Sequence, residues 1–167
     1  MRPARLAQDH TPGVAPALHA AQWLLENEGY QPDLIMLLQP TSPLRIPEDI
    51  DKAVELARET GADAVVSVTQ VEAHPYWMKW RHPDGTLEDF LKVDQPVERR
   101  QNLPEVYVLN GAIYLVRTEM LMEQKTFHTA NTFSLVMPVE RSLDIDTPWD
   151  LYLADLILKD RRRNEVS

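Results

Sequence analysis

A buried strand, an amphipathic helix and a second buried strand follow one another in the first half of the chain, and this order constrains the fold most. The run DLIMLL (33–38) is short, apolar and bounded by turn residues, which is typical of a strand covered on both faces. Pro47 opens a helical pattern that ends at Gly61, and ADAVVSVT (62–69) forms the second strand. Such a unit predicts a right-handed crossover in a parallel α/β sheet, with ligands bound beyond the carboxyl ends of the strands.

Further segments extend this sheet and cover it. Apolar residues recur at helical spacing over residues 14–28, and Gly29 ends that helix. The run FSLVMPV (133–139) is the last predicted strand. Thr147 and Asp150 then form a T-x-x-D helix start with a proline at its first position, so an apolar helix is expected to follow.

One predicted strand, VYVLNGAIYLV (106–116), carries Asn110 and Gly111 in its middle. An Asn-Gly pair commonly forms a tight hairpin turn, but here apolar residues continue on both sides. A hairpin turn and a bulge or close backbone approach are therefore equally consistent with this run.

Residues 72–106 depart from the sheet pattern, because they are rich in proline, aromatic and charged residues and lack a helical period. The PDG turn at residues 83–85 indicates a hairpin. Trp77, Met78 and Trp80 are too closely spaced to be buried together on one strand face. We interpret this segment as a β-rich arm whose apolar surface contacts a second copy in a homodimer or folds back on its own domain.

Composition favours a single globular domain over residues 1–167. The chain is 44% hydrophobic and 26% charged, and its net charge of −9 argues against a nucleic-acid partner. With no cysteine, disulfides, thiolate catalysis and Cys-ligated zinc are excluded. The longest apolar run, LIMLL, is too short to span a bilayer, so we expect a cytoplasmic protein with no membrane partner.

Two carboxylates, Asp144 and Asp146, stand two residues apart immediately before the last predicted helix. In an extended segment, side chains at i and i+2 point the same way, so both could reach one cation that also carries phosphates. A bare D-x-D pattern is also found in solvated acids beside a helix N-terminus. The pair is thus either a Mg²⁺ site or a charged helix start.

Three motifs together resemble the acylneuraminate cytidylyltransferases, also called CMP-sialic acid synthetases. They are LLQPTSPLR at a strand end, RRQNLPEVYVLNGAIYLV and SLDIDT, in this order, and RPARLAQDHT near the start is similar to a further family segment. The resemblance implies a three-layer, mainly parallel, Rossmann-like nucleotide-diphospho-sugar transferase sheet. It also implies a Mg²⁺-dependent reaction in which the anomeric hydroxyl of a nonulosonic acid attacks the α-phosphate of CTP.

The resemblance further implies roles for individual residues. Asp144 and Asp146 would hold Mg²⁺ as the catalytic pair, and Arg2 would lie near the nucleotide. The other implied residues form the sugar side of the site: Gln39, Thr41, Ser42, Arg45, Arg100, Asn110 and Tyr114.

Several of these residues also have simpler interpretations. Arg45 is suited equally to holding its loop to the sheet, and Arg100 either pairs with the sugar carboxylate or is an exposed charge on the arm. Asn110 and Tyr114 fit equally a bulge residue and a core aromatic.

One family feature is missing from this sequence. Complete members begin with a strand and a glycine- and lysine-rich loop, whereas this chain has 5 glycines and no G-x-G. The sheet is therefore expected to lack its first βα units, and the 167-residue chain is expected to have weak or no activity. Two alternatives remain: a non-catalytic dimeric sugar-binding module, or a synthetase for a related acid sugar such as legionaminic acid.

Overall fold

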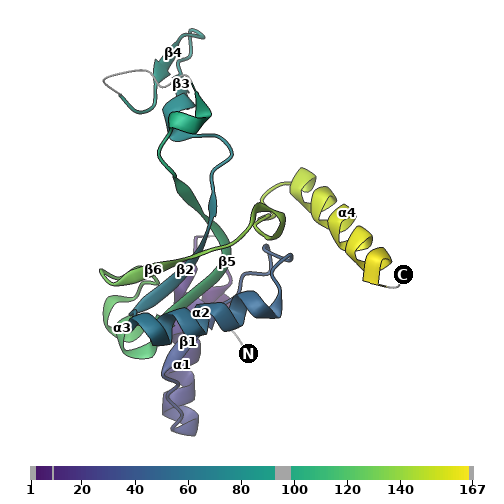
Figure 1. Cartoon of the computed structure of the whole chain (residues 1–167). Coiled ribbons are helices and arrows are strands. Elements are labelled where there is room, and N and C mark those ends of the chain that lie inside the picture. Colours follow the sequence, from purple (N-terminus) through teal and green to yellow (C-terminus); the bar gives the residue numbers. More distant parts are fainter. Residues whose placement is uncertain (1–2, 9, 93–98, 166–167) are drawn as a thin grey trace.

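A four-stranded mixed sheet forms the centre of the computed structural model, which describes residues 3–8, 10–92 and 99–165. Its strand order is β1-β5-β2-β6 (Figure 1). The strands are β1 (Leu34–Leu37), β2 (Ala64–Gln70), β5 (Tyr107–Arg117) and β6 (Thr132–Val136). Strand β5 pairs antiparallel with both β1 and β2, whereas β2 and β6 pair in parallel, so β5 alone runs against the other three.

The predicted strand–helix–strand unit is present, with one difference in pairing. Strands β1 and β2 run in the same direction, as expected for a crossover, but β5 lies between them. Three of the four strands therefore share one direction, as in the mainly parallel sheet that was expected, and β5 runs against them. The apolar second half of β5 is almost entirely buried, so the strand occupies the centre of the sheet rather than an edge.

Helices cover both faces of the sheet and give it three layers (Figure 1). On one face, α2 (Pro47–Thr60) packs Ala53 and Ala57 against Val65, Ile113 and Leu115. On the other face lie α1 (Val14–Glu28) and α3 (Thr118–Gln124), where Leu121 and Phe127 pack against Ala64 and Val116. The predicted α/β class and the boundaries of α1 and α2 are confirmed, and the glycines at both C-termini adopt the left-handed conformation.

The last helix, α4 (Pro148–Glu165), follows a single 3₁₀ turn, η4 (Val139–Arg141), and extends away from the sheet (Figure 1). Its start matches the expected cap, since Thr147 N–H donates to Asp150 Oδ2 at 2.8 Å. Near its far end, the Arg161 guanidinium donates to the carbonyls of Leu44 and Glu140 at 3.1 and 3.0 Å. None of the described helices is both long and apolar enough to cross a membrane.

Between β2 and β5 the chain forms a projecting arm that contains the hairpin of β3 (Lys79–Arg81) and β4 (Leu87–Asp89) (Figure 1). It also contains the 3₁₀ turns η2 (Pro75–Trp77) and η3 (Arg100–Asn102); another such turn, η1 (Ala4–Leu6), lies near the N-terminus. The predicted hairpin is confirmed. Its apolar side chains stay exposed: Trp77, Met78, Trp80, Leu87, Phe90 and Leu91. Folding back on the domain therefore does not bury them.

Asn110 and Gly111 form a bulge in β5, not a hairpin turn. The register with β2 shifts between Val66 and Val68, so Ser67 faces the extra residues of β5. Asn110 is 3% exposed, and its Oδ1 accepts a 2.6 Å hydrogen bond from Ser67 Oγ. Gly111 has a φ of +71°. The close-approach alternative is also correct, because a Cβ on Gly111 would lie 2.7 Å from Asp144 Oδ2.

A Gly111→Ala substitution tests this crowding, with Gly61→Ala as the matched control. Both glycines have a left-handed φ, but a Cβ on Gly61 meets nothing within 4 Å. We expect Gly61→Ala to lower the free energy of unfolding by about 1–2 kcal/mol. Gly111→Ala should cost about 1–3 kcal/mol more, because it adds overpacking to the same backbone strain. Urea denaturation measures both, and equal losses would contradict the crowding.

Candidate active site

Two loops meet at the carboxyl ends of the strands. The first, the glutamine loop (residues 39–45), follows β1. It is held to the sheet by Arg45, whose Nη1 donates to the carbonyls of Gln39, Ser42 and Ala112 at 2.7, 2.9 and 3.3 Å. Burial lowers the pKa of this guanidinium without depriving it of partners. The Arg45 guanidinium therefore fixes the shape of the loop and its distance from β5.

The second loop, the acidic loop (residues 142–147), lies between η4 and α4 and contacts the glutamine loop directly. The Ile145 N–H donates to the Thr41 carbonyl at 2.9 Å. Ser42 Oγ lies 3.4 Å from Asp144 Oδ1. The loop's start is tied to the bulge, since Asn110 Nδ2 donates to Ser142 Oγ at 2.9 Å. Both loops are thus fixed against the same part of β5.

Gly111 is where the candidate side chains converge. A Cβ built on it would lie 2.7 Å from Asp144 Oδ2 and 3.0 Å from Gln39 Oε1. The side chains of Gln39 and Asp144 therefore lie over one backbone position, which only a glycine leaves open. The Asp144 carboxylate is therefore not walled off from the glutamine loop.

A small pocket adjoins this point on the α1 and α3 face of the sheet. It encloses about 210 Å³ and is lined by Gln39 and Tyr114 together with Lys125, Phe127 and His128. The Tyr114 ring packs against Phe127 and His128, with centroid distances of 5.8 and 6.2 Å. Burial raises the pKa of the Tyr114 hydroxyl, and the Asp144 charge raises it further, so this group stays a neutral donor at physiological pH.

Asp144 and Asp146 offer the carboxylate oxygens that Mg²⁺ prefers. Asp144 is half-buried and Asp146 is exposed. Among the described residues, no cluster of three or more His, Cys, Asp or Glu side chains forms a protein-only metal cage. Mg²⁺ commonly binds through one or two carboxylates and otherwise keeps waters and substrate phosphates, so it does not require such a cage. Direct coordination by each carboxylate stays a prediction.

Some predicted sugar-side residues support the site from within. Ser42 is fully buried, with its Oγ 3.3 Å from the Asn110 carbonyl. The Asn110 side chain bonds to Ser67 and Ser142, which bears out its interpretation as a bulge residue. The Arg45 contacts favour its loop-holding alternative. Gln39 and Tyr114 instead line the pocket, and the Thr41 carbonyl joins the two loops.

Two predicted residues are not placed by these contacts. Arg2 lies outside the described residues. Arg100 begins η3 on the arm, and its side chain also lies outside what the structure describes. Their expected contacts with nucleotide and sugar carboxylate stay predictions.

Sequence reasoning missed Lys125, Phe127 and His128, which line the pocket. They follow α3, a seven-residue helix too short for a clear periodic signal. No spacing rule connects them to the glutamine loop. Their placement depends on how the segment after β5 returns to the sheet.

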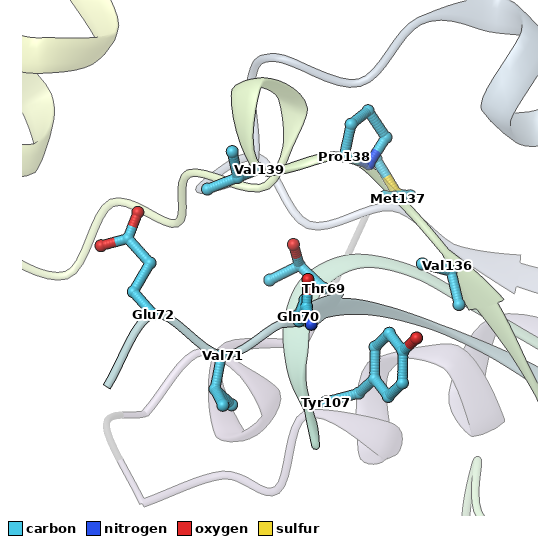
Figure 2. Close-up of a pocket in the computed structure, with 9 residues that line it drawn as sticks. All are labelled: Thr69, Gln70, Val71, Glu72, Tyr107, Val136, Met137, Pro138 and Val139. Carbon is cyan, nitrogen blue, oxygen red and sulfur yellow. The ribbon is translucent and has the colours of Figure 1, made fainter. Parts of the chain in front are cut away.

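A larger hollow in the described part of the chain lies elsewhere. Figure 2 shows this cavity of about 730 Å³ beyond the end of β2, where Thr69, Gln70 and Glu72 face Tyr107 and Val139. It contains none of the candidate site residues. Size alone is therefore a poor guide to the site, and the convergence of side chains at Gly111 is a better one.

Comparison with known proteins gives several sequence relatives that are named as cytidylyltransferases or CMP-sugar synthases. The chain is 37% identical over 128 residues to the CMP-N,N'-diacetyllegionaminic acid synthase of Legionella pneumophila, covering 76% of this chain and 54% of that protein. It is 38% identical over 112 residues to an N-acylneuraminate cytidylyltransferase of Streptococcus agalactiae, covering 67% of this chain and 27% of the relative. A cytidylyltransferase of the same name from Escherichia coli is 30% identical over 167 residues, or 99% of this chain and 38% of the relative.

A solved structure supports the fold independently. It is a CMP:2-keto-3-deoxy-manno-octonic acid synthetase complexed with CTP, with a TM-score of 0.61 at 14% identity over 92% of this chain and 70% of the other. No family model matches the chain. The chain spans about half, or less, of the length of the sequence relatives described above. These three relatives nevertheless cover 67% to 99% of this chain at 30% to 38% identity, and the chain belongs to the N-acylneuraminate cytidylyltransferase family.

Proposed function

We propose that this protein serves nucleotidyl transfer from CTP to a nonulosonic acid, giving a CMP-sugar and pyrophosphate. The convergence of Gln39 and Asp144 at Gly111 is the observation that carries this proposal. A sugar held by the pocket beside Gln39 would have its reacting hydroxyl close to the carboxylates of the acidic loop. Reactions of this type depend on positioning and charge neutralisation more than on covalent catalysis, and fixed loops supply the positioning.

Asp144 and Asp146 would hold Mg²⁺ in this reaction. The ion, when bound, neutralises charge on the phosphates and helps to align them. The contribution of the chain is to fix the acidic loop, through the Ile145 to Thr41 hydrogen bond of 2.9 Å and the Ser42 contact. A carboxylate fixed in advance needs little rearrangement when the ion and the phosphates bind.

On the sugar side, the pocket offers a neutral phenol, an amide and a cation. Tyr114 and Gln39 can hydrogen-bond to hydroxyl or acylamino groups, while Lys125 favours an anion. At about 210 Å³ the pocket suits one substituent of an acid sugar rather than the whole molecule. The names of the relatives favour N-acylneuraminic or N,N'-diacetyllegionaminic acid as the substrate. Arg100 and Arg2 keep their expected roles toward sugar carboxylate and CTP.

We further propose that the arm forms a homodimer contact in the cytoplasm. Its apolar side chains stay exposed in a single chain, with Leu87 at 66% and Trp80 at 56%. Burying such a patch against a second copy is favourable. The absence of cysteine fits a reducing compartment.

The proposal is tested by measuring pyrophosphate release from CTP and Mg²⁺ with N-acetylneuraminic acid, N,N'-diacetyllegionaminic acid and a 3-deoxy-manno-octulosonic acid. Isothermal titration of each sugar provides a measurement of binding that does not depend on turnover. Turnover with one sugar supports the transferase. Sugar binding without turnover favours the non-catalytic sugar-binding module. If the chain shows no turnover and binds no sugar, both the transferase and the sugar-binding module are overturned.

Asp144→Asn and Asp146→Asn should each lower cation-dependent turnover by about 10²- to 10³-fold, because a positioned charge is lost from the transition state. Glu59→Gln removes an exposed carboxylate near the end of α2, away from both loops, and should leave turnover unchanged. The measurement is the initial rate across a Mg²⁺ titration. Wild-type rates in both aspartate variants would contradict the metal role.

Leu87→Glu should convert a dimer to a monomer at micromolar concentration, because it places a charge in the proposed contact without removing a ring packed inside the arm. Leu25→Glu puts the same charge on an exposed apolar position of α1 and should leave the dimer intact. Sedimentation equilibrium measures the mass of each variant. A wild-type chain that is monomeric throughout would contradict the dimer.

A further inference from the structure

An ion pair between a buried aspartate and a half-buried arginine, outside the candidate site, links α2 to η4. Arg141 donates two parallel hydrogen bonds to Asp49, from Nε to Oδ2 at 2.9 Å and from Nη2 to Oδ1 at 2.7 Å. Asp49 is 2% exposed. Its Oδ2 also accepts the Ile46 N–H at 3.1 Å, which caps α2 directly after the glutamine loop. One carboxylate thus joins the end of one site loop to the turn that precedes the other.

The electrostatics of the pair favour its charged form. Burial acts to raise the pKa of the Asp49 carboxyl, but the hydrogen bonds from Arg141 and Ile46 and the arginine charge together leave this pKa below its usual value. Removing either partner of a buried pair leaves the other uncompensated and is strongly destabilising locally. The bidentate geometry also fixes direction, which a lysine would not.

The pair lies close in sequence to the acidic loop. Arg141 is three residues before Asp144. Between them Ser142 Oγ accepts a hydrogen bond from Asn110 Nδ2 at 2.9 Å, and beyond Asp144 the Ile145 N–H donates to Thr41 O at 2.9 Å. Asp144 therefore lies on a short segment anchored at both ends. At one end the anchors are the Asp49–Arg141 pair and the Ser142 contact with Asn110, and at the other the anchor is the glutamine loop.

We propose that Asp49 and Arg141 are positioning residues for the acidic loop and, through it, for the cation site. The cation part of this inference rests on the proposed function. The two residues do not touch the reacting groups; they set where Asp144 stands over Gly111. Residues that hold a metal ligand in place without touching the metal commonly change metal affinity by 10- to 100-fold when they are lost.

The sign of the effect separates positioning from simple charge. Arg141 is a cation close to the acidic loop, so removing its charge should by electrostatics alone strengthen binding of a divalent ion. Removing the Asp49 charge should weaken it. Positioning instead predicts that Arg141→Gln and Asp49→Asn both weaken binding, and that the double variant is no worse than the more affected single one.

The experiment uses nuclear magnetic resonance on the full chain. Hydrogen exchange of the Ile145 amide, measured without any divalent ion, reports whether the loop is fixed to Thr41. Mn²⁺ titration, followed by paramagnetic broadening of the amides around Asp144, reports cation affinity. The variants are Asp49→Asn, Arg141→Gln and their combination. Arg117→Gln is the control, because Arg117 pairs with Asp63 at the far end of β5.

We expect about tenfold faster Ile145 exchange and 10- to 100-fold weaker Mn²⁺ binding in both pair variants, with neither change in the control. Unchanged exchange in Arg141→Gln, or Mn²⁺ binding strengthened by that variant, would overturn the inference. If the wild-type chain shows no broadening at Asp144, the cation site of the proposed function fails, and the exchange rates alone then decide whether the pair positions the loop.

Discussion

The close approach of two loops to the backbone of Gly111 is the constraint on which the rest of the site depends. The bulge in β5 turns this residue to a φ of +71°, and the absent Cβ leaves space for Asp144 and Gln39. The bulge is itself held by Asn110, whose amide bonds to Ser67 on one side and Ser142 on the other. A local irregularity in one strand therefore determines where both loops stand.

Most polar groups around this point hold the site together, and few are left to contact a ligand. Ser42, Asn110 and Asp49 are buried and bonded within the protein, and no buried side-chain polar atom in the described residues lacks a partner. Satisfied buried networks of this kind are rigid. Gln39, Tyr114 and the two aspartates of the acidic loop stay accessible. In a preorganised site, buried residues are expected to fix the geometry while accessible residues contact the ligand.

The sequence predicted the elements better than their arrangement. The helices 14–28 and 47–60 carry strong periodicity and terminal glycines, so local chemistry is sufficient to place them. The insertion of β5 between β1 and β2 depends on long-range pairing that no local pattern records. The resemblance assigned Gln39 and Asp144 to one site, and both side chains lie near Gly111. A resemblance does not distinguish a residue that contacts a ligand from one, such as Asn110, that supports the site. Exposure makes that distinction, and exposure comes only from the packed structure.

The positive charges near the two loops are engaged within the protein, and this bears on the Mg²⁺ proposed to bind with the anionic ligands. The chain carries a net charge of −9, yet its proposed ligands are anions. The arginines that border the two loops are already engaged: Arg45 with three carbonyls, Arg141 with Asp49 and Arg161 with two carbonyls. Their charges stabilise loop geometry, and turning them toward phosphates would break the contacts that place Asp144. Neutralisation of the proposed triphosphate would therefore draw on groups beyond these arginines, and the Mg²⁺ proposed at Asp144 and Asp146 would meet that need.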